Sequence, residues 1–166
     1  MSTSQVEVFA KIFETEFEAT RKAAESVAPE ARLKQAKEGK AHPLWLIGHL
    51  AFATDNILNV IAFGGKHTAP RSFNKLFAPD ILGGAPIVAD AGAYPSWEDT
   101  LDTYTRVCEQ CVKEVRALTD DQLPGPVKGT PPEPFRDFFR SVEHVLRISA
   151  SHEAYHRGQM NLIANL

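Results

Sequence analysis

Apolar residues recur at alternating intervals of three and four along four stretches of the chain. This spacing gathers side chains on one face of an α-helix and predicts four helices. No stretch shows the sustained period-two alternation of a β-strand, so the expected fold class is all-α. The expected helices run from Thr3 or Ser4 to Ala28, from Pro43 to the Gly64-Gly65 pair, from Ser96 to Leu118, and from Ser141 to Ala164.

Three of these helices show a distinct inner edge, whereas the second is apolar around most of its circumference and is expected to be the most buried. The edge of the first helix is Val6, Phe9, Phe13, Phe17, Thr20, Ala24 and Val27. The edge of the third is Trp97, Leu101, Tyr104, Cys108, Cys111, Val115 and Leu118. The edge of the fourth is Val142, Val145, Ser149, His152, His156, Gln159 or Met160, and Ile163.

Two long connections separate the helices. Residues 64–95 hold four prolines and can span the length of a helix of about 30 Å, so the second and third helices are expected to run parallel, joined by a crossover. Within this segment Ser72–Phe77 is expected to form one short helical turn. Residues 124–134 are too rich in proline for a helix interior. The expected architecture is a four-helix bundle in one domain, residues 1–166, with a long crossover between helices two and three.

Length and charge narrow the class of protein. The chain has 166 residues and a formal net charge of −3, which gives no electrostatic basis for binding nucleic acid. The N-terminus lacks the pattern of a signal peptide, so a cytoplasmic protein is expected. Residues 44–63 approach the length of a membrane span, but His49, Asp55, Asn56 and Asn59 interrupt them with groups that are costly in lipid. A buried helix and no membrane partner are therefore expected.

The two cysteines, Cys108 and Cys111, form a CxxC sequence that suggests a redox or zinc motif. They fall on the apolar edge of the third helix, with no preceding strand and no second pair of cysteines. The sequence therefore favours small buried hydrophobic residues over redox or zinc chemistry.

His152 and His156 lie four residues apart and so share one face of a helix, a spacing that can chelate a metal ion. His49 is the best candidate for a third ligand, because an antiparallel second helix places it at the same level. Three neutral imidazoles leave positions open for water or substrate, as catalytic sites do. Zinc and nickel suit these ligands best, and iron or copper are possible. Metal affinity is expected to fall as the pH drops through roughly 6.5. The other histidines, His42, His67 and His144, are expected at the surface.

The segment from His152 to His156 also spells HExxH, the signature of zinc proteases. Those enzymes take a third ligand downstream, but no His, Asp or Glu follows His156. A protease is therefore not expected. Two alternatives remain open for Glu153: a catalytic base that contacts a metal-bound water, or an exposed glutamate on the helix surface.

The sequences GHL, with His49, and HxxxHxGQ, ending at Gln159, resemble the pattern of the DinB-like superfamily. The resemblance covers the whole chain and its helix order. It implies a four-helix bundle, a metal centre at His49, His152 and His156, and often a homodimer. Relatives include metal-dependent thiol S-transferases that use bacillithiol and a mycothiol-dependent maleylpyruvate isomerase.

Within that pattern, Gly158 is expected to allow close approach of a neighbouring group. Gln159 is expected to hydrogen-bond a ligand histidine or to contact the bound substrate or cofactor. Arg157 is either solvated or attracts a substrate carboxylate. The expected function is a metal-dependent transferase acting with a low-molecular-weight thiol on an electrophilic substrate. A metal-dependent hydrolase and a non-catalytic metal- or ligand-binding module remain as alternatives.

Overall fold

The computed structural model describes residues 4–166, and throughout that range the regular structure is helical with no strand, which confirms the all-α class. The long elements are α1 (Gln5–Glu25), α2 (Pro43–Ala53), its continuation η2 (Thr54–Ala62), α4 (Trp97–Arg116) and α5 (Val142–Ala164). The short ones are η1 (Pro29–Ala31), α3 (Ser72–Leu76), η3 (Asp80–Leu82), η4 (Ala91–Ala93), η5 (Asp120–Gln122) and η6 (Glu133–Phe139).

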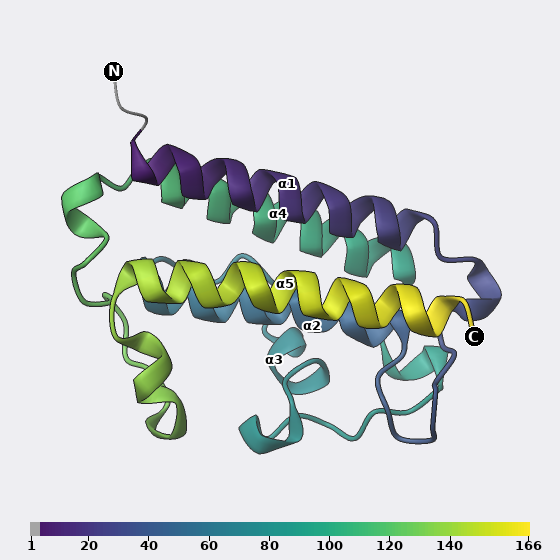
Figure 1. Ribbon diagram of the computed structural model, residues 1–166. Helices are drawn as coiled ribbons and strands as arrows, with labels where there is room; N and C mark the ends of the chain where they lie inside the picture. Colours follow the sequence, from purple (N-terminus) through teal and green to yellow (C-terminus); the bar gives the residue numbers. More distant parts are fainter. Residues whose placement is uncertain (1–3) are drawn as a thin grey trace.

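The long helices pack side by side: α1 contacts α4 and α5, and α2 also contacts α4 and α5 (Figure 1). The segment between η2 and α4, residues 63–96, returns along α2 and is called the crossover segment, or crossover, below. Near its beginning the Thr68 N–H donates to Asp55 at 2.9 Å, and near its end the Val88 carbonyl lies 3.0 Å from Nε2 of His42, just before α2. Arg32, which precedes α2, pairs with Glu98 in the first turn of α4 at 2.9 Å. Consequently, α2 and α4 begin at the same end of the molecule.

The helix ends lie close to the predicted positions. The serines at two predicted helix starts are N-caps: Ser96 Oγ accepts from the Asp99 N–H at 3.0 Å, and Ser141 Oγ accepts from the His144 N–H at 3.1 Å. α1 ends short of the predicted Ala28, and the alternative start at Thr3 lies outside the described residues.

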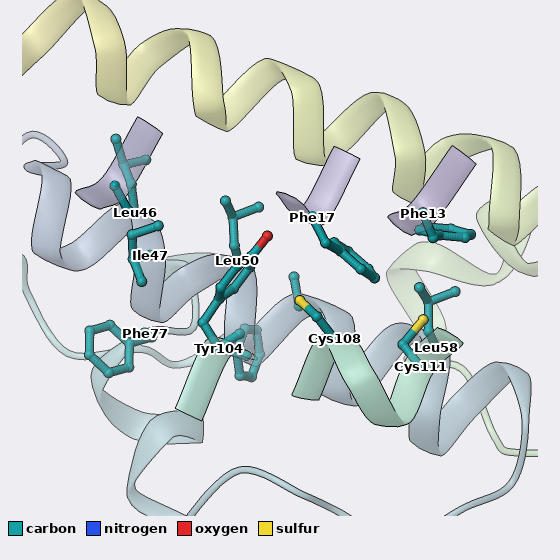
Figure 2. Close-up of a cluster of buried hydrophobic side chains, with 14 of the residues drawn as sticks. Phe13, Phe17, Leu46, Ile47, Leu50, Leu58, Phe77, Tyr104, Cys108 and Cys111 are labelled. Atoms are coloured by element: carbon teal, nitrogen blue, oxygen red, sulfur yellow. The ribbon is translucent and has the colours of Figure 1, made fainter. Parts of the chain in front are cut away.

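The predicted inner edges supply much of the core, although several residues of the third and fourth edges are only half-buried. Every residue of the edge predicted for the first helix is buried. Cys108 and Cys111 are buried beside Phe17 and Leu58 and carry no disulfide, as Figure 2 shows. They therefore act as small core residues. Burial raises the pKa of both thiols, which removes the thiolate that redox chemistry would need.

The second helix is the most buried element, as predicted, and every residue of α2 is buried. The stretch Pro43–Ala62 is long and apolar enough to cross a membrane, but 78% of its most apolar window is buried inside the protein. Its second half changes to π-helical bonding, so that the Phe63 N–H donates to the carbonyl of Leu58, five residues back, at 3.0 Å. This change was not predicted. Such wide turns are rare in proteins, and those that occur are often at functional sites.

Asp55 anchors the start of the crossover from inside the protein. Its carboxylate is fully buried and accepts hydrogen bonds from the backbone N–H groups of Thr68 and Ala69 at 2.9 and 3.3 Å. It also accepts from Nδ1 of His67 at 2.9 Å and from the Asn59 amide at 3.2 Å. One side chain thus satisfies two backbone donors that would otherwise lack partners.

We expect Asp55→Ala to lower the free energy of unfolding by about 3 kcal/mol, because it leaves these backbone donors unpaired. Chemical denaturation followed by circular dichroism measures this. Asp102→Ala is the matched control, since the pair of Asp102 with Arg106 is exposed, and it should cost less than about 0.5 kcal/mol. Equal losses in the two variants would contradict the anchoring role of Asp55.

Candidate metal centre

Three histidines from α2 and α5 bring their ring nitrogens together. His49 lies in α2, and His152 and His156 lie one turn apart in α5. Nε2 of His152 is 3.1 Å from Nε2 of His156 and 3.4 Å from Nε2 of His49. One candidate ligand atom from each residue lies within 4.8 Å of the other two. The residues predicted from sequence therefore form one cluster.

The spacing of these nitrogens fits a tetrahedral transition-metal ion. Zinc binds imidazole nitrogen at about 2.0–2.1 Å, so two nitrogens on one ion lie about 3.3 Å apart. The two measured separations, 3.1 and 3.4 Å, bracket that value. Two of the three separations therefore suit ligands of one divalent ion, and the candidate ligand atoms of His49 and His156 lie within 4.8 Å of each other.

His49 is oriented by the crossover. Its Nδ1–H donates to the carbonyl of Phe77 at 2.9 Å, which leaves the lone pair of Nε2 for the cluster. Trp45 stacks on one face of the imidazole, with ring centroids 4.7 Å apart and ring planes at 7° to each other. Gly48 is required beside it, because a Cβ at that position would lie 2.2 Å from the ring of Phe77. Gly48 thus allows the ring of Phe77 to pack against α2, and the carbonyl of Phe77 orients His49.

His156 is oriented by Gln159. Its Nδ1–H donates to Oε1 of Gln159 at 2.7 Å, and the Gln159 amide donates in turn to the hydroxyl of Tyr155 at 2.9 Å. Gln159 therefore makes the first of the two contacts expected for it, a hydrogen bond to a ligand histidine. This bond fixes the tautomer in which Nε2 is free to bind a metal.

We expect Gln159→Leu to weaken zinc binding by about tenfold, because His156 loses the partner that fixes its ring. Titration against a chromophoric chelator measures the change. Asn161→Leu, at an exposed position of the same helix, is the matched control and should leave the affinity unchanged. An affinity of Gln159→Leu equal to that of the control would show that the hydrogen bond does not support the ligand.

Burial keeps the ligand histidines unprotonated at neutral pH. It lowers the pKa of His49 to about 4 and that of His152 to about 3, and it also lowers the pKa of His156. Protons therefore compete with a metal only at lower pH than the value of roughly 6.5 expected for ordinary histidines. Metal affinity is therefore expected to fall at a lower pH than the sequence predicted.

Glu153 lies on another side of α5 from the ligand histidines. Its side chain is 2% exposed, and Oε1 accepts a hydrogen bond from the hydroxyl of Tyr104 in α4 at 2.6 Å. Burial raises the pKa of its carboxyl to about 7. The exposed alternative is therefore wrong, and Glu153 is not part of the histidine cluster. Adjacent residues on an α-helix are turned by about 100° from each other, so Glu153 points away from the face that carries His152. This rotation could have been inferred from the sequence.

Two neighbouring residues also differ from expectation. Nothing lies within 4 Å of a Cβ built on Gly158, so no close approach requires this glycine. Arg157 donates to a carboxylate oxygen of Glu16 at 2.6 Å and to its backbone carbonyl at 3.2 Å, which ties α5 to α1. The guanidinium is thus committed to an ion pair.

The remaining histidines are not uniformly at the surface. His42 is fully buried: its Nδ1 accepts from the Trp45 N–H at 3.1 Å and its Nε2–H donates to the Val88 carbonyl at 3.0 Å. The surface prediction for His42 is wrong, because the imidazole caps α2 and holds the end of the crossover. His67 is partly exposed and His144 is half-buried.

A cavity of about 530 Å³ opens beside the histidine cluster. Its walls come from α2, η2, α5, the turn at η3 and the η6 segment, whose aromatic residues had not been predicted as part of the site. A larger groove of about 850 Å³ lies along α1 and α4 and does not include the histidines. The smaller cavity is lined by Trp45, His49, Phe52, Ala53, Asn56, Ile57, Ile61, Pro79, Ile81, Leu82, Pro132, Phe135, Phe138, Phe139, Val145, Ile148, Ser149, His152 and His156.

The fold and the cluster together define an all-α protein with a three-histidine group able to hold a metal ion. The sequence model of the DinB superfamily matches residues 12–160, and the chain belongs to this family. No curated protein matches the sequence significantly.

Proposed function

We propose that the protein is a metal-dependent transferase that acts with a low-molecular-weight thiol at the cluster of His49, His152 and His156. The observation that carries this proposal is the position of three unprotonated nitrogens at the wall of a cavity of about 530 Å³. A divalent ion held there lowers the pKa of a thiol or water bound in its open position. Zinc or nickel suits three imidazole ligands best, with iron or copper as alternatives.

In the proposed reaction the thiol sulfur attacks an electrophilic carbon of the second substrate. A sulfur–carbon bond forms, the bond from that carbon to its leaving group breaks, and the leaving group departs with the electron pair. The thiol proton passes to solvent, since Glu153 does not line the cavity. Gln159 acts as a positioning residue through His156, and a contact of Gln159 with substrate is part of the proposal.

The setting of this activity is also proposed. We place the protein in the cytoplasm and take the packing of α1, α2, α4 and α5 as a four-helix bundle with a crossover between α2 and α4. A homodimer, without nucleic-acid or membrane partners, is the expected assembly. Light scattering at micromolar concentration measures the mass, and a monomer would contradict the dimer.

Two other functions use the same site. A hydrolase would use water in place of the thiol at the open metal position. A binding module would need only the histidines and the cavity. The two cysteines are buried and do not line the cavity, so they supply no nucleophile there, which is compatible with such a module. The hydrolase would release a different product from the transferase, and the binding module would form none.

The deciding experiment incubates zinc-loaded protein with a panel of thiols and a chloro-dinitroaromatic electrophile, and in parallel with a panel of nitrophenyl esters. Thioether formation that is lost in His152→Ala and kept in His144→Ala supports the transferase. Ester cleavage with the same dependence would replace it by the hydrolase. Ligand-induced thermal stabilisation without turnover in either panel would replace it by the binding module.

A further inference from the structure

The cavity beside the histidines has no charged wall. Among the described residues 4–166, no Asp, Glu, Lys or Arg lines it. Its polar members are Asn56, Ser149 and the three ligand histidines. Away from the histidine cluster, a carboxylate or ammonium group inside this cavity would lose its water without meeting an opposite charge, a costly exchange.

Two side chains close in sequence or space to the cavity, a guanidinium and an amide, already have partners. Arg157 follows a ligand histidine but pairs with Glu16 on α1 and does not line the cavity. The Asn56 amide donates to the carbonyl of Phe52 at 2.9 Å and to Oδ1 of Asn74 at 3.2 Å. The cavity therefore offers an acidic ligand no free guanidinium.

Apolar side chains remain accessible where the cavity meets solvent. Ile57, Ile61 and Ile148 are only half-buried although they sit on long helices. At the rim Ile81 is 70% exposed and Phe138 is 50% exposed. An apolar compound in the cavity would remove this surface from water, which is the main source of affinity at such sites.

Aromatic rings form much of the lining. Trp45 and Phe52 come from α2, and η6 contributes Phe135, Phe138 and Phe139. η6 packs against α5, the helix that carries His152 and His156 (Figure 1). Rings on two sides of one cavity suit a planar aromatic body, with the histidine cluster at the wall to meet its polar end.

We infer that the cavity accepts a neutral, largely apolar compound with an aromatic body and excludes compounds that carry a carboxylate on that body. In the proposed transferase this compound is the substrate, so the assignment as substrate rests on the proposed function. The preference itself belongs to the walls of the cavity and is present without metal.

The test uses metal-free full-length protein and the neutral dye N-phenylnaphthylamine, whose fluorescence rises in apolar surroundings. Benzyl mercaptan and its para-carboxylate analogue then compete with the dye. Metal is omitted because a carboxylate could bind it and mask the effect of the walls. We expect the dye to bind and the neutral thiol to displace it at least about tenfold more effectively than the charged analogue. Equal or better displacement by the carboxylate would overturn the inference, as would a dye that does not bind.

Two variants place the ligand in the cavity. Ile148→Glu adds a charge to the wall and should weaken dye binding at least about tenfold, whereas Leu162→Glu, at an exposed position of the same helix, should leave it unchanged. Phe138→Glu at the half-exposed rim is a second variant that does not depend on the tolerance of the helix. Unchanged dye binding in folded Ile148→Glu and Phe138→Glu would overturn the inference.

The outcomes separate this inference from the proposed function. Preferential binding of the neutral thiol by metal-free protein, followed by no turnover with zinc, would retain the cavity's preference and remove the transferase. Turnover of charged and neutral thiols at equal rates, with equal displacement of the dye, would retain the transferase and remove the preference.

Discussion

Replacing His152 by alanine is expected to lower zinc affinity by at least about a hundredfold, since the loss of partners that merely orient a ligand already costs 10–100-fold. His152 is the central member of the cluster, because its Nε2 lies within 3.4 Å of both other Nε2 atoms. Without it, two imidazoles from different helices remain. Competition with a chromophoric chelator at neutral pH measures the affinity.

His144→Ala is the matched control for this variant. His144 lies on the same helix and is half-buried, but it does not belong to the cluster. Its removal should leave zinc affinity within about twofold of the wild type, because no ligand or ligand partner changes. Similar losses in the two variants would mean that zinc binds elsewhere or that any change in α5 disturbs the protein.

Glu153→Gln is expected to stabilise the protein at pH 8 by about 3 kcal/mol and to have little effect at pH 4. Burial raises the pKa of this carboxyl from 4.5 to about 7, so the folded protein holds a proton that the unfolded chain releases. This contribution to stability is complete below pH 4.5 and is lost as the pH rises to about 7. Glutamine keeps the acceptor for Tyr104 and never ionises. Urea denaturation across this pH range measures the difference.

Glu143→Gln provides the comparison on the same helix. Glu143 pairs with Arg147 near the surface, and its replacement should change stability by less than about 1 kcal/mol at each pH. A stability difference for Glu153→Gln that stays constant with pH would show that Glu153 titrates normally, in conflict with its burial beside Tyr104.

Periodicity predicted the all-α class and the positions of the long helices. The inner edge of α1, from Val6 to Val27, is buried in full, and Ser96 and Ser141 cap α4 and α5. The third ligand, His49, was predicted from the expected antiparallel packing of the second and fourth helices. The pairing of His152 with His156 could also be predicted, because a spacing of four places both on one helix face. That pairing, like the caps and the apolar edges, depends on local geometry, which sequence spacing reports directly.

Features that depend on long-range contacts could not be predicted. The buried position of His42 arises because Val88, far along the chain, supplies an acceptor for its ring. The π-helical bonding of η2 accompanies the anchoring of the crossover by Asp55, which no local pattern reveals. The aromatic residues of η6 join the cavity only through the path of a proline-rich connection. The metal ligands could therefore be predicted from the sequence, whereas the shape of the cavity could not.

X-ray absorption spectroscopy of zinc-loaded protein tests the central claim most directly, because it reports the atoms bound to the ion. The account predicts a shell with three imidazole nitrogens at about 2.0–2.1 Å, reduced in His49→Ala and unchanged in His144→Ala. A shell that contains sulfur at about 2.3 Å, or one that lacks the multiple-scattering signal of imidazole, would contradict a centre formed by His49, His152 and His156.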